Sequence, residues 1–217
     1  MTVSHHPDDA TLLRYASGGL DEAFAVVVAS HLAMCARCRK AAHDAEAIGG
    51  ELLAEAGDAP LVPDAFARLL DRLDEPRAPA VPPPLPAEAG DVPLPLRRLV
   101  GPSLDAIAWK TVAPGVATHA IELGGAGRSA LFMLNVAPGK SVPEHGHGGE
   151  EITLVLTGAY RDAFGRFGPG DVADLDERAE HHPRVEPGAR CVCIIAAEAP
   201  ARFKGIFSRL YQPFVGI

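Results

Sequence analysis

Residues 139–158 read GKSVPEHGHGGEEITLVLTG, and this stretch decides the fold of the second half of the chain. Side chains two apart on an extended strand point to one face, so His145 and His147 can converge on one point. Glu151 follows a short glycine turn and opens the apolar run 152–156. Two imidazoles and a carboxylate suit a divalent metal ion, so the stretch predicts a metal site on a β-rich scaffold.

The spacing Gly-x5-His-x-His-x3-Glu-x6-Gly resembles the first motif of the cupin superfamily. This resemblance implies a β jelly-roll barrel that holds a metal ion. A second cupin motif would start at Gly170, but Asp176 and Arg178 stand where that motif has proline and glycine. His181 keeps the position of the fourth metal ligand. His182 is the competing assignment, because neighbours on a strand point to opposite faces.

Eight prolines lie between residues 76 and 95, and they divide the chain. Proline fixes φ and lacks an N–H, which predicts an extended polyproline II spacer with neither helix nor central strand. The resulting α+β architecture has a domain at 1–75, a proline-rich linker at 76–95 and a cupin domain at 96–217.

Residues 1–75 show helical patterns. Asp8 can cap a first helix, and Gly18-Gly19 ends it. Asp21 can start a second helix that runs through His31 to Cys35. We expect a third helix from about 37 to 48, ending before Gly49-Gly50, and a fourth at 64–73 with an apolar stripe.

The rest of the chain shows short apolar and β-branched runs separated by Gly and Pro turns, at 118–123, 129–136, 152–157 and 189–197. Such spacing is typical of a sandwich or a barrel. Cys191 and Cys193 lie two apart in the last run, so both thiols face the same way. They pack as small hydrophobic side chains or, if they face the metal cavity, can be oxidised.

A second group of metal-binding residues occurs in the helical part, as His31-x3-Cys35-x2-Cys38. His31 and Cys35 stack on one helix face, and Cys38 returns one turn later. Two thiolates and one imidazole make three quarters of a tetrahedral zinc site, and either His5 or His6 can supply the fourth ligand. Zinc here would supply much of the folding free energy of a small helical domain.

This pattern in a small helical domain resembles the zinc-binding anti-sigma factors, and the added proline tether and cupin resemble their ChrR-type members. The resemblance covers the chain from His5-His6 to Gln212-Pro213-Phe214. It implies zinc ligands at His6, His31, Cys35 and Cys38, and a one-to-one complex that keeps an extracytoplasmic-function sigma factor from core RNA polymerase. It further implies release by singlet oxygen or an organic peroxide, sensed through a cupin that holds Zn²⁺ or another divalent metal at His145, His147, Glu151 and His181. The helix at 64–73 would either contact the sigma factor or pack on the first three helices.

The net charge of the chain limits the classes of partner that it can bind. The formal net charge is −8, and residues 1–75 hold thirteen acidic and six basic side chains. This balance favours a basic protein partner over nucleic acid. There is neither a long apolar run nor a signal peptide, so we expect a cytoplasmic protein that does not contact a membrane.

The cupin pattern leaves a second function open. Three histidines and a glutamate on a divalent metal can also activate oxygen, as in a cupin dioxygenase with a fused regulatory domain. The sequence shows no further acid–base pair of recognisable spacing, so we expect a regulator rather than an enzyme.

Overall fold

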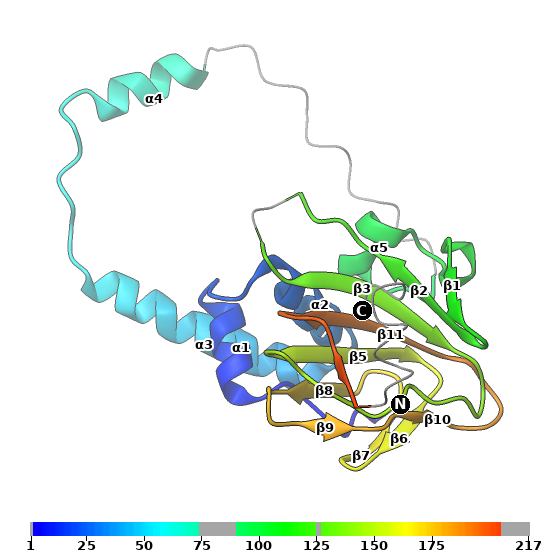
Figure 1. Ribbon diagram of the computed structural model, residues 1–217. Helices are drawn as coiled ribbons and strands as arrows, with labels where there is room; N and C mark the ends of the chain where they lie inside the picture. Colours follow the sequence, from blue (N-terminus) through cyan, green and yellow to red (C-terminus); the bar gives the residue numbers. More distant parts are fainter. Residues whose placement is uncertain (1, 74–89, 125–126, 205–217) are drawn as a thin grey trace.

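The computed structural model describes residues 2–73, 90–124 and 127–204. Figure 1 shows helices α1 to α3 against a β-rich body, with α4 apart from it. The helices are α1 (Asp9–Ala16), α2 (Glu22–Met34), α3 (Ala36–Glu55), α4 (Ala65–Leu73) and α5 (Leu94–Val100), with a 3-10 turn at Leu104–Ala106. The strands are β1 (Lys110–Ala113), β2 (Val116–Ala120), β3 (Ala130–Val136), β4 (His145–Gly146), β5 (Glu151–Thr157), β6 (Tyr160–Asp162), β7 (Gly165–Phe167), β8 (Val172–Leu175), β9 (Glu180–His181), β10 (Arg184–Val185), β11 (Cys191–Ala197) and β12 (Arg202–Phe203).

The first two helices begin where the sequence predicts. The Asp8 carboxylate accepts a hydrogen bond from the Thr11 N–H, and the Asp21 carboxylate accepts one from Ala23. Each carboxylate satisfies a backbone donor that has no partner in the first turn and interacts favourably with the positive end of the helix dipole. Gly18, with a φ of 72°, ends the first helical segment in the left-handed conformation.

The predicted end of the third helix is wrong. Instead of stopping before Gly49-Gly50, α3 continues to Glu55. A glycine inside a helix costs about 1 kcal/mol relative to alanine but removes no hydrogen bond. The strong helix formers at 51–55 therefore carry the helix through both glycines.

The predicted linker is partly outside the described residues, which resume at Gly90. Its last two residues are helical rather than extended, because α5 starts at Leu94 and takes Pro95 into its first turn. Proline is tolerated there, since an N–H in the first turn has no intrahelical acceptor.

The strands form a cupin barrel from one large sheet and two small ones. The large sheet has the order β1-β2-β3-β11-β5-β8, and the small sheets have the orders β10-β6-β7 and β12-β4-β9. The runs predicted at 129–136, 152–157 and 189–197 are its three adjacent strands β3, β5 and β11, all antiparallel.

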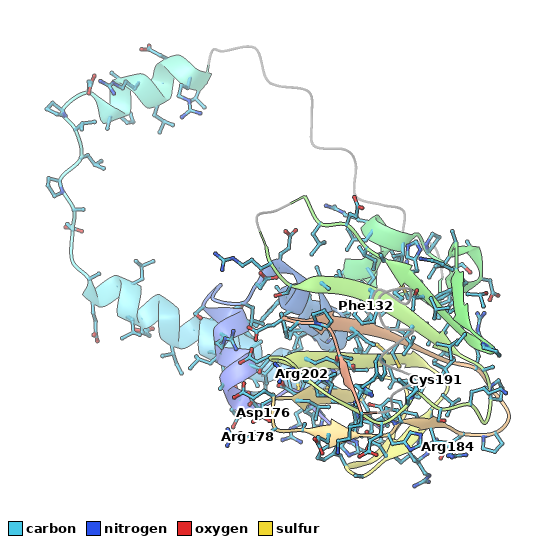
Figure 2. All side chains as sticks on the ribbon, viewed as in Figure 1. Phe132, Asp176, Arg178, Arg184, Cys191 and Arg202 are labelled. Carbon is cyan, nitrogen blue, oxygen red and sulfur yellow. The ribbon has the colours of Figure 1, made fainter. Side chains whose placement is uncertain are left out.

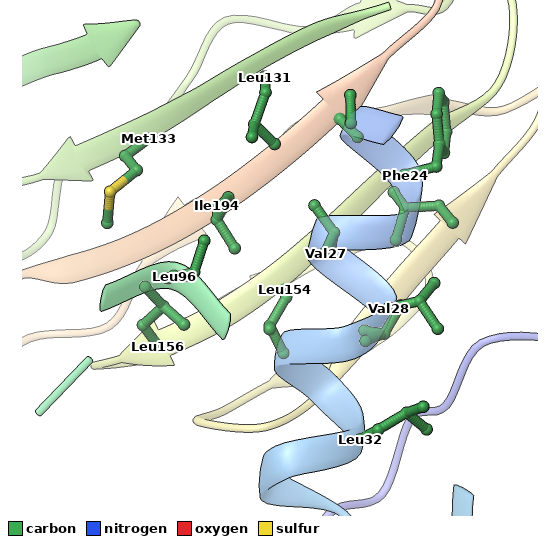
Figure 3. Packing of buried hydrophobic residues seen from close by; sticks show 14 of the residues in the cluster. Phe24, Val27, Val28, Leu32, Leu96, Leu131, Met133, Leu154, Leu156 and Ile194 are labelled. Carbon is green, nitrogen blue, oxygen red and sulfur yellow. The ribbon is translucent and has the colours of Figure 1, made fainter. Parts of the chain in front are cut away.

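Both faces of this large sheet are buried, against different partners. On β11, Cys193 and Ile195 point into the barrel, while Ile194 and Ala196 point outward to the helices. Figure 3 shows α2 lying across the outer face, with Val27 and Val28 near Leu154. Helix α2 is mostly apolar, and its buried face includes Phe24, Val27 and Leu32, while Glu22 and Ala33 are exposed. The helical segment and the barrel therefore share one hydrophobic cluster.

Helix α4 differs from the others because none of its residues is buried. Its stripe of Phe66, Leu69, Leu70 and Leu73 is exposed, with Phe66 at 72% and Leu73 at 73%. Figure 2 shows its side chains standing clear of the body. Of the two alternatives for this helix, packing of the stripe on the first three helices is therefore wrong. Among the helices that the structure describes, none is long and apolar enough to cross a bilayer.

Two candidate metal centres

The first centre lies where the N-terminal segment meets the end of α2. The possible ligand atoms of His6, His31, Cys35 and Cys38 all lie within 4.8 Å of one another. His6 Nδ1 lies 3.6 Å from the Cys35 sulfur and 3.3 Å from the Cys38 sulfur. Tetrahedral zinc, with Zn–S of about 2.3 Å and Zn–N of about 2.0 Å, would separate sulfur and nitrogen by about 3.5 Å. The four residues fit zinc.

His5, the alternative fourth ligand, takes no part in this cluster. Its ring packs against Phe167 with centroids 4.3 Å apart, and its Nδ1 lies 3.8 Å from the Asp171 carboxylate. Consecutive residues of an extended segment point to opposite sides, which brings His6 and not His5 to the cysteines.

Hydrogen bonding orients the buried ring of His31. Its Nδ1 donates to the Gly170 carbonyl over 2.9 Å, which leaves Nε2 buried without a partner. Burial lowers the pKa of His31, so the ring is neutral at pH 7. Burial and the neighbouring Cys35 raise the pKa of Cys38 to about 12. Such a thiol ionises at neutral pH only beside a strong positive charge, which a divalent cation supplies.

The second centre lies inside the barrel. His145, His147, Glu151 and His181 are all buried, and their possible ligand atoms lie within 4.8 Å of one another. Strand β4 pairs His145 directly with His181 of β9, and Glu151 is the first residue of β5. His182 is exposed and outside the cluster. The structure thus brings together the four residues that the sequence selects, and metal binding by both clusters stays a prediction.

The ring nitrogens of this second cluster suit a bound cation. His145 Nδ1 donates to the Pro143 carbonyl, and His181 Nδ1 donates to the Asp162 carboxylate, each over 2.8 Å. In a neutral imidazole, the other nitrogen then carries only a lone pair. The two Nε2 atoms face each other 3.0 Å apart, so two lone pairs meet in a buried place whenever both rings are neutral. A metal ion between the two rings removes this conflict.

The pKa shifts of His145 and Glu151 favour the protonation states that bind a metal ion. Burial and the neighbouring His181 lower the pKa of His145 to about 4, so its ring is neutral at pH 7. Burial would raise the pKa of Glu151, but His147, whose Nδ1 lies 3.3 Å from Oε2, outweighs it and the pKa is lowered. Neutral imidazoles and a carboxylate are the forms that bind metal.

Asp162 holds one of the candidate ligands in place, and its sequence context does not reveal this contact. Its side chain is fully buried and accepts the Nδ1 proton of His181, which fixes the tautomer with Nε2 toward the cluster. A carboxylate behind a metal-binding histidine is a common arrangement. Asp162 starts the β6–β7 turn and accepts from the Phe164 N–H, so in sequence it reads as a turn residue.

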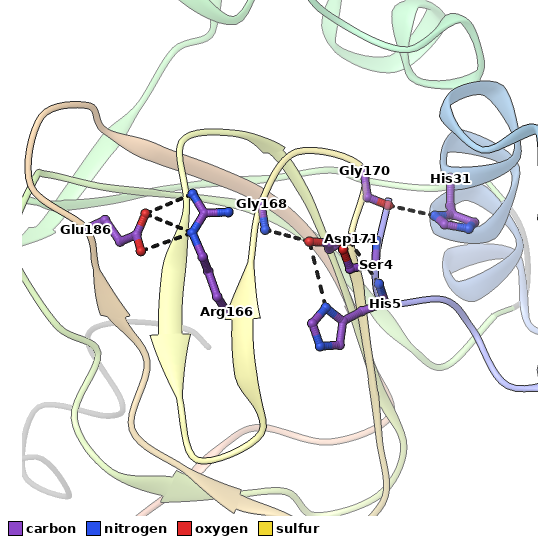
Figure 4. A network of polar contacts seen from close by, with 8 residues as sticks. All are labelled: Ser4, His5, His31, Arg166, Gly168, Gly170, Asp171 and Glu186. Carbon is purple, nitrogen blue, oxygen red and sulfur yellow. Dashed lines mark hydrogen bonds and ion pairs between the residues drawn. The ribbon is translucent and has the colours of Figure 1, made fainter. Parts of the chain in front are cut away.

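A polar network joins the first centre to the barrel (Figure 4). Asp171 Oδ1 accepts hydrogen bonds from the backbone N–H groups of Ser4 and His5, over 2.6 and 3.0 Å. The same corner supplies the Gly170 carbonyl to His31. Gly170 N–H in turn donates to Val155 of β5, the strand that begins with Glu151. The turn at Gly170 and Asp171 therefore contacts two places. One is His31, a candidate ligand of the first centre, and the other is β5, the strand that carries Glu151 of the second centre.

The sulfur atoms of Cys191 and Cys193 lie 3.7 Å apart and line the barrel cavity that the second cluster also lines. Both are free thiols that pack among apolar residues. The hydrogen bond with Cys191, together with burial, raises the pKa of Cys193, which keeps this thiol protonated.

Comparison with known proteins gives consistent matches along the chain. The family model described as ChrR Cupin-like domain matches residues 99–200. The anti-sigma-E factor ChrR of Cereibacter sphaeroides is 41% identical over 219 residues, covering 100% of both proteins. In the crystal structure of Rhodobacter sphaeroides SigE in complex with the anti-sigma ChrR, the matching chain is 39% identical with a TM-score of 0.76. That match covers 90% of the present chain and 99% of the other.

Proposed function

The chain belongs to the ChrR family of anti-sigma factors, and we propose that it binds an extracytoplasmic-function sigma factor in a one-to-one complex. The complex keeps the sigma factor from core RNA polymerase in the cytoplasm. The observation that carries the proposal is the 41% identity to an anti-sigma factor over the full length of both proteins.

The surface of the helical segment supports this function. The exposed stripe of α4 offers Phe66, Leu69 and Leu70 to a partner, and Leu52 and Leu53 are exposed separately, near the end of α3. Exposed apolar side chains gathered on one helix face are typical of a protein-binding site. The acidic excess of residues 1–75 suits a basic polymerase- or promoter-binding surface.

We propose zinc at His6, His31, Cys35 and Cys38, where it holds the N-terminal segment against α2 and α3. The protein would be divided functionally at the proline-rich segment, with sigma binding at 1–75 and sensing at 96–217. The barrel cluster of His145, His147, Glu151 and His181 would hold zinc or another divalent metal and serve as the sensor of singlet oxygen or an organic peroxide.

The network at Gly170 and Asp171 suggests how a signal in the barrel reaches the sigma-binding segment. A ligand can shift an equilibrium only if it interacts differently with the two states. A change at Glu151 that moves β5 would move the Gly170 carbonyl, which orients His31. The first centre would then loosen, and the sigma factor would dissociate.

The test is co-expression of the full chain with an extracytoplasmic-function sigma factor from the same organism. We expect the two proteins to co-purify in equal amounts, with two metal ions in each copy of the chain. His31→Ala should lose one metal ion and the partner together. Failure of the wild-type chain to retain the sigma factor would overturn the proposal. Metal-dependent turnover of a diketone, abolished by His145→Ala, would instead support the cupin dioxygenase.

A further inference from the structure

The short segment that carries His6 is fixed by the barrel. The residues before α1 form neither helix nor strand, and they run beside β8, the last strand of the large sheet. The N–H groups of Ser4 and His5 donate to Asp171 Oδ1, over 2.6 and 3.0 Å (Figure 4). The His5 carbonyl in turn accepts from the Val172 N–H over 3.2 Å. The backbone immediately before His6 is therefore held by the start of β8.

The contact with the barrel continues beyond His6. The Asp8 N–H donates to Asp174 Oδ2 over 3.1 Å, so β8 holds the segment on both sides of His6. The Val3 side chain lies close to Gly170, where an added Cβ would meet it at 2.8 Å. Barrel residues thus set where the His6 backbone stands.

The same turn of the barrel orients the other imidazole of the first centre. The Gly170 carbonyl accepts the Nδ1 proton of His31 over 2.9 Å. Cys35 and Cys38 need no such contact, because they lie at the junction of α2 and α3. The turn that ends at Asp171 therefore sets the two histidines relative to the two thiols.

Asp171 suits this role because it is buried and charged. The residue is 5% exposed, and its second oxygen, Oδ2, accepts from the Gly168 N–H of its own turn over 2.8 Å. Burial would raise the pKa of Asp171, but the backbone N–H donors of Gly168, His5 and Ser4 outweigh it and the pKa is lowered. An ionised carboxylate holds backbone N–H groups more strongly than a neutral acceptor does.

We propose that Asp171 is a positioning residue of the first metal centre, which acts through the backbone of Ser4 and His5 to hold His6 where it binds zinc. The inference rests on the proposed zinc at this centre. A segment that is already fixed loses less conformational freedom when the metal binds, so the centre gains affinity. Loss of the Asp171 contact would free His6 and weaken the centre without removing any ligand.

Titration of the full chain with Co²⁺ measures the first centre separately. Thiolates bound to Co²⁺ give a charge-transfer band in the near ultraviolet, and of the two clusters only the first contains cysteine. Competition with Zn²⁺ then gives the zinc affinity. We expect Asp171→Asn to weaken zinc binding here at least about tenfold, the effect typical of a residue that supports a metal ligand.

Arg14→Gln is the matched control. It also replaces a charged group by an amide between the helical segment and the barrel, where Arg14 lies 2.7 Å from the Glu150 carboxylate, but it leaves the contacts beside His6 intact. It should change the zinc affinity of the first centre less than about threefold. Equal losses in Asp171→Asn and Arg14→Gln would overturn the proposal.

A second background separates positioning from stability. Because Asp171 also accepts from Gly168, its substitution can loosen the barrel itself. If Asp171 acts through His6, then Asp171→Asn in a His6→Ala chain should change the Co²⁺ affinity less than about threefold, since the contact no longer has a ligand to position. The same loss in the His6→Ala background as in the wild-type background would overturn the proposal.

Amide hydrogen exchange of the wild-type chain decides if a variant fails to fold or if the His6→Ala chain binds no Co²⁺. After a chelator has removed the metal, we expect the Ser4 and His5 N–H groups to stay protected, because the barrel and not the metal holds them. The Val155 N–H, which donates to the Asp171 carbonyl inside the barrel, is the reference. Exchange of Ser4 and His5 at the rate of an unfolded chain, with Val155 still protected, would contradict the assigned role.

The proposed zinc and this inference fail separately. A wild-type chain that gives no thiolate band with Co²⁺ overturns metal binding at the first centre. A wild-type chain that gives the band, with Asp171→Asn indistinguishable from Arg14→Gln, overturns the role of Asp171 and leaves the zinc standing.

Discussion

At the scale of single residues, each centre depends on a hydrogen bond that holds a histidine from behind. His31 donates to the Gly170 carbonyl, and His181 donates to the Asp162 carboxylate. Both bonds use Nδ1 and leave Nε2 for the cluster. The sequence identifies the histidines through their spacing, but it cannot identify Asp162 or Gly170, whose roles depend on contacts across the barrel.

Asp162→Asn tests the support of His181. The amide is a poorer acceptor and carries no charge, so the histidine tautomer and its basicity are less well fixed. We expect metal affinity at the second centre to fall about 10- to 100-fold, measured by competition with a chromogenic chelator. Asp176→Asn, at an exposed carboxylate that pairs with Arg178, is the matched control and should leave affinity unchanged. Equal affinities for the two variants would rule out the assigned role.

Gly170→Ala tests the close approach of the helical segment to the barrel. Gly170 has a φ of 89°, and a Cβ there would meet the Val3 side chain at 2.8 Å. Gly139→Ala is a matched control, because Gly139 follows a proline in the same way and has a φ of 72° with no atom within 4 Å of the added Cβ. Both variants carry a backbone cost of about 1–2 kcal/mol. In urea unfolding we expect Gly170→Ala to lose more stability than Gly139→Ala, and an equal loss would show that the Val3 contact contributes nothing.

At the scale of elements, the sequence predicts what local chemistry decides. The caps at Asp8 and Asp21, the strands β3, β5 and β11, and the stripe of α4 all follow from side-chain chemistry and periodicity. The predicted end of α3 and the predicted extended backbone at residues 94–95 were wrong, because α3 continues through two glycines and α5 takes Pro95 into its first turn. The seven apolar residues of β11 do not alternate, and this was the signal that both faces of the sheet are covered.

Leu69→Glu tests α4 as a partner-binding element. Leu69 is 55% exposed, so the change should alter the free energy of unfolding by less than about 0.5 kcal/mol. A charge in the middle of an apolar interface should nevertheless weaken the sigma complex by at least about 2 kcal/mol, or roughly thirtyfold. Ala67→Glu adds the same residue beside the stripe as a control. Titration calorimetry that gives one affinity for both variants would exclude α4 from the interface.

At the scale of the whole molecule, the main feature is the common core of the helical segment and the barrel. The sequence indicates two units joined by a tether, and the shared cluster of α2, α5 and the large sheet was not foreseen. Val27 and Leu154 belong to this cluster from opposite sides of the proline-rich segment. Which faces of two units meet depends on long-range packing that local patterns do not encode.

A shared core predicts a single cooperative unfolding transition. Separating α2 from the sheet would expose Val27, Val28 and Ile194 to water, which costs about 1.5–3 kcal/mol for each large side chain. In differential scanning calorimetry of the metal-loaded chain, we expect one heat-absorption peak. Two well-separated peaks would show that the helical segment and the barrel unfold independently, contrary to the common core.

A molecule that withholds a sigma factor from RNA polymerase should inhibit transcription in vitro. Core polymerase and the sigma factor transcribe a cognate promoter while purified chain is added in increasing amounts. We expect inhibition that is complete near equal concentrations of chain and sigma factor and is relieved by Leu69→Glu. Transcription that continues unchanged in about a tenfold excess of the wild-type chain would contradict it.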